Sequence, residues 1–344
     1  NQVDRSALVL FAMVGALILT IFNNLVMLFL GIEILSISLY VLAGSRKELS
    51  STEAAFKYLL MGSFATGFLL FGIALIYGAT GLFHLDQIAE LLATQPVLPA
   101  FFYAGLLLLL VGLTFKISAV PFHFWAPDVY SGSPTAITAF MATVVKMAAL
   151  AAFIRVFASC FAEVSGTWKT ALNIIMVLTL VLPNITAVYQ TQVKRLLAYS
   201  SVGHVGYVLL AFVSSPTTST PVIFYYLITY AIASLSAFVV LIHFEKSEEE
   251  ELSILHFNGL YRKNPMLAVV MTLALLSLAG IPPLAGFFGK YMVFAHAVLH
   301  GYTVITLVAV VTSLIGAYYY FKIIIAMYLK EPSGNTVELF AEQK

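Results

Sequence analysis

Residues 7–44 read ALVLFAMVGALILTIFNNLVMLFLGIEILSISLYVLAG, an apolar run of 38 residues in which Glu33 is the only charge. As one helix rising 1.5 Å per residue, this run would be about 57 Å long, nearly twice the thickness of bilayer hydrocarbon. Asn23 and Asn24 lie near its middle and are the natural place for a turn. The stretch therefore predicts two membrane-spanning helices, the second of which carries a carboxyl group.

The composition of the whole chain extends this interpretation. Hydrophobic residues make up 61% of the 344 positions and charged residues 10%, whereas about a quarter of a soluble domain is charged. A soluble globular fold is thereby excluded, and the lipid bilayer is the expected environment. The runs are continuously apolar rather than alternating, which favours helices over a membrane barrel. We expect an all-α, polytopic membrane protein.

Ten spans follow from the apolar runs, and two of them contain helix breakers. The expected helices cover residues 6–22, 25–44, 53–80, 100–131, 134–160, 168–189, 195–214, 220–244, 266–299 and 302–330. The fourth holds Pro121 and Pro127, and the ninth holds Pro282, Pro283 and Gly286, each able to interrupt the backbone hydrogen bonds.

Each interrupted helix is the fourth in a set of five. Because five is odd, two such sets lie inverted relative to each other, an arrangement typical of transporters. The third helix of each set begins with a similar tetrapeptide, Phe56-Lys57-Tyr58-Leu59 in the first set and Phe224-Tyr225-Tyr226-Leu227 in the second. This similarity is weak evidence for a repeat. The predicted organisation is a first five-helix repeat in residues 1–161, a second, inverted repeat in 162–330, and a cytoplasmic tail or linker in 331–344.

The orientation follows from the distribution of basic residues. One side of the membrane has Arg5, Arg46, Lys47, Lys194, Arg195, Lys246, Arg262, Lys263 and Lys330, and the other has Lys169 and Arg155. The positive-inside rule makes the first side cytoplasmic. The acidic run 248–251 then falls in a cytoplasmic loop, and residues 82–99 form a short amphipathic surface segment on the outside.

Four charges fall near the middle of spans: Glu33, Lys116, Lys146 and Lys290. A central charge costs about 2.5 to 3.5 kcal/mol, so four together cost on the order of 10 kcal/mol unless they pair or reach water. Structural ion pairing is one interpretation, but three lysines against one glutamate leave two cations unmatched. The other is a hydrated proton relay, because burial brings the neutral form of a lysine within reach.

Within this set, Glu33 and Lys116 are the best candidate pair, in which the carboxylate stabilises the charged lysine. Lys116 precedes the first helix break, where freed carbonyl groups can solvate an ammonium, and Lys290 follows the second. A relay would thus be tied to both interruptions.

Further titratable residues are possible members of the relay. His204 lies mid-span, at the position that repeat order matches to the helix of Glu33, and is either a relay group or a packing histidine. His123 lies two residues after Pro121 and could carry protons or cap backbone. Lys322, matched to the helix of Lys146, could join the relay or extend toward the cytoplasmic side.

For four other polar residues we expect structural roles. His243 and His296 lie near helix ends or on crowded faces, Asp128 is expected to cap the second half of the broken helix, and Lys57 is expected to extend toward the cytoplasmic side.

The chain shows no phosphate-binding loop and no zinc or cysteine cluster, and Cys160 is its one cysteine. We therefore expect no cofactor or metal in this chain, with any redox chemistry located in partner subunits. The net charge of +1 gives no reason to expect nucleic acid as a partner.

Several motifs, in the same order, resemble the antiporter-like subunits of complex I, and specifically the subunit N type of bacterial NADH:quinone oxidoreductase. They are FLGIE (29–33), FKISAVPFHFWAPDVY (115–130), KRLLAYSS (194–201) and LAGIPPLAGFFGK (278–290). The residues of the second motif and the lysine at position 290 favour subunit N over the related L and M types.

The resemblance implies a proton channel in a bacterial inner (plasma) membrane, driven by quinone reduction and surrounded by other membrane-arm subunits. FMN, iron–sulfur clusters and quinone are then expected in partner subunits. By matching motif, Glu33 and Lys116 would be the modulating pair, Lys146 the connecting lysine and Lys290 the terminal one. The family usually has fourteen helices, so the resemblance also implies a fragment without the first three and the last.

Two other functions remain open at this point. A multi-subunit cation/proton antiporter of the Mrp type shares these motifs, and sodium dependence of transport would distinguish it. A purely structural spacer of the membrane arm is the third possibility.

Overall fold

The protein is described here by a computed structural model that covers residues 2–95, 97–244 and 252–332. Over these residues the chain forms helices, turns and loops, with two isolated β-bridges and no β-strand. The all-α prediction is confirmed. The predicted acidic run at 248–251, Lys246 and most of the predicted tail at 331–344 lie outside the described residues.

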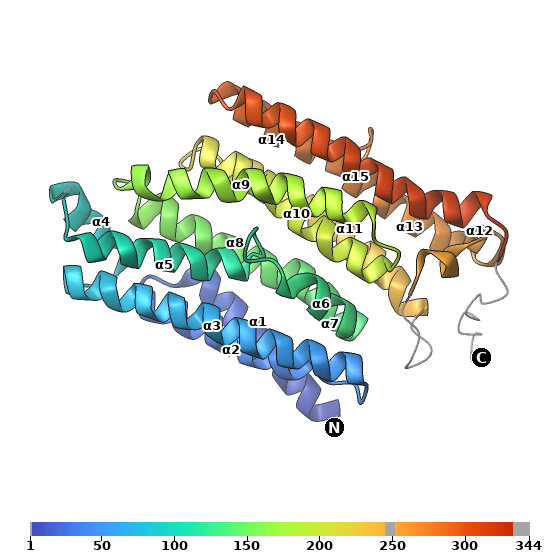
Figure 1. Ribbon diagram of the computed structural model, residues 1–344, viewed down its shortest axis with the longest axis horizontal. Coiled ribbons are helices and arrows are strands. Elements are labelled where there is room, and N and C mark those ends of the chain that lie inside the picture. The colour runs from blue at the N-terminus through green and yellow to red at the C-terminus, as the bar shows by residue number, and fades with distance from the viewer. Residues whose placement is uncertain (1, 96, 245–251, 333–344) are drawn as a thin grey trace.

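The helices lie side by side in a single bundle along the long axis of Figure 1, and α1 begins at the same end at which α15 finishes. The first half contains α1 (Gln2–Ile21), α2 (Leu25–Ala43), α3 (Leu49–Thr80), α4 (Leu85–Thr94), α5 (Ala100–Lys116), α6 (Trp125–Gly132), α7 (Thr135–Phe140), η1 (Met141–Val145), α8 (Lys146–Arg155) and η2 (Val156–Cys160). The second half contains α9 (Ser165–Val188), α10 (Val193–Ser214), α11 (Thr220–Phe244), η3 (Ile254–Phe257), α12 (Leu260–Lys263), α13 (Pro265–Ala279), α14 (Ala285–Leu299) and α15 (Thr303–Leu329).

Eight helical segments of the described residues are long and apolar enough to cross a membrane. The other two predicted spans are the interrupted ones, which the structure divides into α5 with α6 and α13 with α14. The predicted set of ten spans thus agrees with the observed helices. The fifth span is continuous but includes two π-helical segments, η1 and η2, which the sequence did not indicate.

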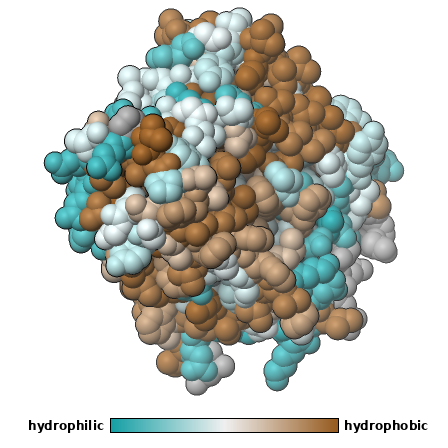
Figure 2. Space-filling model, turned by 60° about the vertical axis from the view of Figure 1, so that its left-hand side comes forward, coloured by the Kyte–Doolittle hydropathy of each residue, from teal (hydrophilic) through white to brown (hydrophobic). Residues whose placement is uncertain are grey.

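The surface of the bundle is that of a protein solvated by lipid. Large apolar side chains such as Leu10, Phe64 and Leu314 are strongly exposed. Figure 2 shows hydrophobic residues over much of the visible face, with smaller hydrophilic groups between them. Exposure of apolar area on this scale is unfavourable in water, so it indicates helices that face acyl chains.

The first break begins where α5 ends at Lys116, and the chain becomes helical again at Trp125. Pro121 lies inside this break. Pro127 does not interrupt the helix, because it lies in the first turn of α6, where its missing N–H is not needed. Thr179 Oγ1 of α9 accepts a hydrogen bond from Val120 N at 2.9 Å, so a neighbouring helix satisfies backbone that the break leaves free.

The second break lies between α13 and α14. Gly280 ends α13 in the left-handed conformation, with φ of 83°, and Pro282 and Pro283 follow. Gly286 lets α14 return against α13, because a Cβ at this position would lie 1.9 Å from Ser277 O. The break is therefore a tight, packed turn rather than an open loop.

Helix α10 is the centre of the bundle. It packs against α6, α9, α11, α14 and α15, and 94% of its most apolar window is buried. A helix that is apolar on all sides must be covered on all sides. His204 lies near the middle of this helix and is therefore held inside the protein.

The segment predicted to be amphipathic is α4, which buries Leu85, Ile88 and Leu92 on one face. It lies beside the α1–α2 turn, where a β-bridge joins Asn24 to His84. We call this the α4 end of the bundle. The predicted amphipathic character of this segment is confirmed, and its location outside the membrane stays a prediction; η3 and α12 appear in a connection for which we expected only a loop.

Close packing of α3 against α5 gives a test of the fold. A Cβ at Gly72 would lie 2.7 Å from Gly105 O and 2.8 Å from Leu109 N, which are backbone atoms that cannot move aside. Gly72→Leu should therefore cost about 1 to 3 kcal/mol of unfolding free energy, measured by denaturation in mixed micelles. Gly67→Leu is the matched control on the same helix, because nothing lies within 4 Å of that position. Equal stability of the two variants would contradict this packing.

Candidate functional site

The three mid-span lysines are all buried. Lys116, Lys146 and Lys290 have relative exposures of 5%, 3% and 6%. Among the residues that the structure describes, none of the three is within ion-pair distance of a carboxylate. Each ammonium group instead contacts uncharged oxygen atoms and an aromatic ring, and these contacts define the candidate site.

Lys116 is the last residue of α5. Its Nζ donates to Ser36 Oγ of α2 at 2.8 Å and lies 3.4 Å from Tyr58 OH of α3. Glu33 lies one turn before Ser36 on the same helix, and its Oε1 is buried without a hydrogen-bond partner in the described structure. The predicted pair is thus arranged around Ser36 rather than as a direct ion pair.

A small cavity adjoins this lysine. Its volume is about 10 Å³, and Ser36, Tyr40, Thr66 and Lys116 supply its polar lining. This is about the room that one water molecule occupies. The site can therefore hold a proton carrier beside the ammonium group.

Lys146 begins α8, directly after the π-helical segment η1. Its Nζ donates a short hydrogen bond to Ser201 Oγ of α10. Tyr230 of α11 donates to the same oxygen at 2.8 Å and lies 3.1 Å from Ala142 O, inside η1. A π-helical turn leaves such a carbonyl available for outside donors, and turns of this kind are frequent at functional sites.

His204 connects this group to the second break. Its Nδ1 is hydrogen-bonded to Tyr226 OH and its Nε2 to Tyr320 OH at 3.2 Å. The ring of Tyr230, which contacts Ser201, has its centroid 4.9 Å from that of His204. Both nitrogens of the imidazole therefore face hydroxyl groups that can donate or accept a proton.

Lys290 lies in the second turn of α14. Its Nζ donates to Ala279 O at 2.9 Å and to Ser313 Oγ at 2.8 Å, and it lies 5.1 Å from the centroid of the Tyr207 ring. Ala279 is the last residue of α13, so the break supplies a carbonyl that a continuous helix would have used. His204 and Lys290 also line one cavity of about 10 Å³.

The lysines thus form a row with two different halves. Between Lys146 and Lys290 the row is polar, through the hydroxyl groups and imidazole just described. Between Lys116 and Lys146 it is aromatic: the rings of Tyr58 and Trp125 stack with centroids 4.6 Å apart, and Trp125 meets Tyr130 at 5.9 Å. Tyr130 faces Lys146 with its ring, and its hydroxyl is buried without a partner in the described structure.

The other predicted relay residues lie away from this row. His123 is buried in the first break, its ring lies against Phe124 and Tyr199, and its Nδ1 has no hydrogen bond among the described residues. Lys322 donates to Gln190 O at 3.4 Å, just after the end of α9. Neither contacts Lys146 or Lys290 directly, and their part in the relay stays a prediction.

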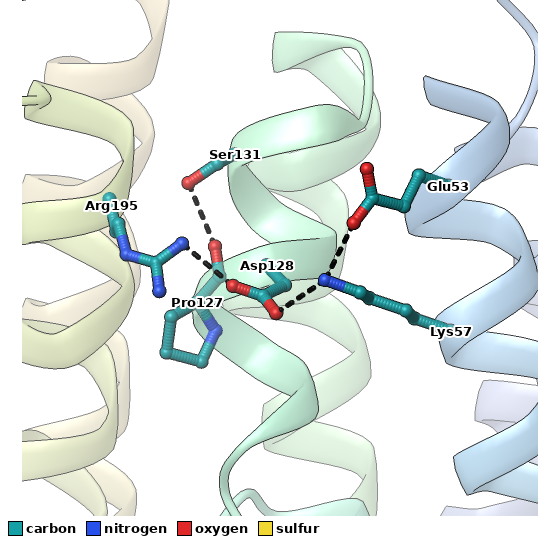
Figure 3. A network of polar contacts seen from close by, with 6 residues as sticks. All are labelled: Glu53, Lys57, Pro127, Asp128, Ser131 and Arg195. Atoms are coloured by element: carbon teal, nitrogen blue, oxygen red, sulfur yellow. Dashed lines mark hydrogen bonds and ion pairs between the residues drawn. The ribbon is translucent and has the colours of Figure 1, made fainter. Parts of the chain in front are cut away.

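Asp128 and Lys57 belong to an ion-pair network that the sequence did not predict. Asp128 accepts from Lys57 Nζ at 2.9 Å and from Arg195 Nη1 at 2.7 Å, and Lys57 also lies 2.7 Å from Glu53 (Figure 3). The start of α6 has no side-chain cap, so the predicted capping role of Asp128 is wrong. The expectation that Lys57 extends toward the cytoplasmic side stays a prediction, and its ion pairs with Glu53 and Asp128 were not expected.

This network joins α3, α6 and α10 beside the first break. Ser131 donates to Pro127 O within α6, as Figure 3 also shows. Sequence spacing could not reveal it, because the charges lie 67 and 71 residues apart. The predicted structural roles of His296 and His243 agree with their contacts to Ser214 Oγ and Val239 O.

A helical bundle with two interrupted spans and a buried polar row defines an α-helical membrane protein of the transporter class. The family described as "NADH:quinone oxidoreductase/Mrp antiporter, TM" matches residues 23–316. The chain belongs to this family and is a multi-pass membrane protein.

Individual relatives indicate which type of subunit within this family the chain is similar to. The chain is 50% identical over 332 residues to NADH-quinone oxidoreductase subunit N of Cytophaga hutchinsonii, covering 96% of this chain and 72% of the relative. Among solved structures it is similar to a chain of respiratory complex I from Thermus thermophilus with bound aureothin, with TM-score 0.85, 40% identity and coverage of 98% and 73%. It is also similar to a chain of the Mrp complex from Dietzia, with TM-score 0.86, 25% identity and coverage of 96% and 62%. The predicted resemblance to subunit N is confirmed.

The Asp128 network predicts unequal couplings to Lys57. Asp128 is 31% exposed and binds two cations, whereas Glu53 is 59% exposed and binds Lys57 alone within the described residues. In double-mutant cycles with Lys57→Met, Asp128→Asn should show a coupling of about 1 kcal/mol and Glu53→Gln less than about 0.5 kcal/mol, because exposed pairs are screened. Unfolding in mixed micelles measures both, and a larger coupling for Glu53 would contradict the arrangement.

Proposed function

We propose that this chain is a proton-translocating membrane-arm subunit of an NADH:quinone oxidoreductase (complex I). The observation that carries the proposal is the burial of Lys116, Lys146 and Lys290 against neutral oxygens, without a carboxylate partner among the described residues. A permanently charged ammonium group in such a place is unfavourable in free energy, and a purely structural site would be more stable with a neutral side chain. Groups that bind and release protons are the function that explains this cost.

The polar half of the row supplies a route. A proton on Lys146 can pass to Ser201 and Tyr230, whose hydroxyl groups both donate and accept. From there the cavity that Tyr230 shares with Tyr226 and Lys290 leads to the Tyr226 hydroxyl, which is hydrogen-bonded to His204 Nδ1, and to Lys290. Water in that cavity completes the step, because hydroxyl, imidazole and amine then follow one another at hydrogen-bonding range.

The aromatic half of the row controls the passage of protons between Lys116 and Lys146. Trp125 and Tyr130 separate Lys116 from Lys146 through ring contacts, and no hydrogen bond connects the two lysines across these rings in the described structure. Lys116 is coupled through Ser36 to the helix of Glu33, so a change in the charge of Glu33 alters the proton affinity of Lys116. Movement of the broken α5–α6 span then connects or separates the two halves.

The driving reaction takes place in partner subunits. FMN, iron–sulfur clusters and quinone belong to those subunits, and this chain contributes no redox centre. The remaining membrane-arm subunits are its neighbours, and the bacterial inner membrane is its location. The basic residues at the end of the bundle opposite α4 are on the cytoplasmic side.

The two halves of the chain, 1–161 and 162–330, are the inverted repeats. Lys116 contacts Ser36, three residues after Glu33, and Lys290 contacts Tyr207, three residues after His204. Tyr58 and Tyr226, which the weak sequence similarity aligns, lie beside the two equivalent lysines: Tyr58 OH is 3.4 Å from Lys116 Nζ, and Tyr226 lines the same cavity as Lys290. These matching environments support an internal repeat.

A cation/proton antiporter subunit of the Mrp type is the second candidate. The likeness to the Mrp structure favours it, although the identity of 25% is lower than the 40% to the complex I chain. Proton translocation that requires sodium and continues without NADH oxidation would identify the antiporter. Translocation that requires NADH and quinone supports the proposal.

Replacement of the buried lysines tests the proposal. Lys116→Met, Lys146→Met and Lys290→Met keep length and packing while removing the charge, so the complex should assemble and pump at no more than about half the wild-type rate. Lys47→Met is the matched control, because Lys47 is exposed on the α2–α3 loop. Proton uptake by inverted vesicles during NADH oxidation gives the measurement. Unchanged pumping in the three variants, and in Glu33→Gln, would refute the channel.

The central histidine has its own test. His204→Gln keeps hydrogen-bonding groups but cannot carry a proton, so translocation should slow at least about twofold while the amount of assembled complex is unchanged. His243→Gln serves as the control, because His243 is exposed and bonded only to Val239 O in the described structure. If both variants pump like the wild type, His204 is a packing residue.

A further inference from the structure

A cleft lies at the α4 end of the bundle, away from the lysine row. It has a volume of about 430 Å³ and is formed by the α1–α2 turn, the start of α4, the α8–η2 segment and the start of α11. These segments lie toward the end of the bundle at which Figure 1 labels α4. The cleft combines charged and apolar walls, which is unusual for a surface that only faces acyl chains.

Arg155 is the central feature of the cleft. It is exposed, although it lies five residues, or about 7 Å along a helix, inside the end of its span. Its guanidinium donates to Thr20 O at 3.2 Å and lies 5.6 Å from the centroid of the Phe22 ring. A guanidinium has five N–H groups, so these contacts fix its position and leave donors directed to the cleft.

Asp86 provides a second charge at the same cleft. It lies in the first turn of α4, outside the spans, and is exposed. Among the described residues it is not within ion-pair distance of Arg155. The cleft therefore presents a carboxylate at its outer rim and a guanidinium deeper toward the hydrocarbon, and neither neutralises the other by contact.

The apolar wall continues inward from these charges. Ile154 and Ala151 lie deeper than Arg155 on α8, and Phe224 and Leu227 lie deeper than Thr220 on α11. From outside to inside the cleft thus offers a negative group, a positive group and a hydrocarbon surface. A phospholipid with an ethanolamine headgroup has the complementary order of ammonium, phosphate and acyl chain.

We propose that this cleft binds one zwitterionic phospholipid of the phosphatidylethanolamine class. Arg155 holds the phosphate by charge-assisted hydrogen bonds, Asp86 accepts from the primary ammonium, and Phe224 and Leu227 pack against an acyl chain. The choice of headgroup follows from Asp86, because the carboxylate repels a purely anionic lipid and a choline group has no N–H to donate.

Lipid exchange on the purified assembly tests the proposal. The assembly is incubated with an equimolar mixture of phosphatidylethanolamine, phosphatidylglycerol and phosphatidylcholine, re-isolated, and its retained lipid is quantified by mass spectrometry. The wild type should retain phosphatidylethanolamine preferentially. Arg155→Gln should lower this retention about tenfold, whereas Arg155→Lys, which keeps the charge, should lower it only about threefold.

Asp86→Asn separates headgroup selection from binding. Total retained lipid should persist, while the preference for phosphatidylethanolamine over phosphatidylglycerol should fall about tenfold. Glu90→Gln on the same helix and Arg262→Gln are matched controls, because both residues are exposed and neither lines the cleft. Both controls should retain lipid like the wild type.

Three results would overturn the proposal. One is equal retention of the three lipids by the wild type, and another is unchanged retention in Arg155→Gln. The third is displacement of the retained lipid by inorganic phosphate alone, which would indicate a free-anion site. A photoreactive residue in place of Phe224 gives an independent measurement: a lipid adduct supports the proposal, and an adduct with protein contradicts it.

Discussion

The hydrogen bonds that hold Lys116, Lys146 and Lys290 against neutral oxygen atoms are the interactions on which this structure depends. A charge inside hydrocarbon is tolerated only where backbone or side-chain dipoles replace water. The bundle supplies these dipoles at irregular places: Ala279 O at the end of α13, Ser201 beside the π-helical segment η1, and Ser36 opposite the end of α5. The two breaks and the π-helical segment η1 thus each have a lysine as a neighbour, and these irregularities are where the proposed proton path runs.

Burial of α10 organises the rest of the bundle around that path. This helix carries Ser201 and His204 on turns that face α11 and α15, so one covered helix contributes to both the Lys146 and the His204 groups. The Asp128 network then fixes the start of the same helix to α6 and α3. The polar half of the row is therefore rigidly supported, while the aromatic half, through Trp125, belongs to the short α6 between the first break and α7.

The sequence was sufficient for the outline of the fold and for the buried lysines of the candidate site, but not for the residues that contact them. Long apolar runs predicted the spans, and Pro121, Pro282 and Pro283 predicted both breaks, because proline acts locally on its own helix. The lysines were conspicuous because a mid-span charge is costly wherever it occurs. Ser201, Tyr230 and Tyr320 were not, because serine and tyrosine are ordinary in such helices and acquire their role only from residues 29 to 120 positions away. The network of Asp128 was missed for the same reason. The π-helical turn before Lys146 could not be predicted either, because the helix propensities of its residues do not distinguish it from an ordinary α-helix.

In the function that we propose, protons travel along the buried lysine row and cross the aromatic segment between its halves. A structure of the assembled complex during turnover, at a resolution that shows ordered water, tests this most directly. We expect water beside Lys116 and in the His204–Lys290 cavity, and a displaced Trp125 that allows water to join Lys116 to Lys146. A dry, closely packed segment around Trp125 and Tyr130 in every turnover state would contradict it.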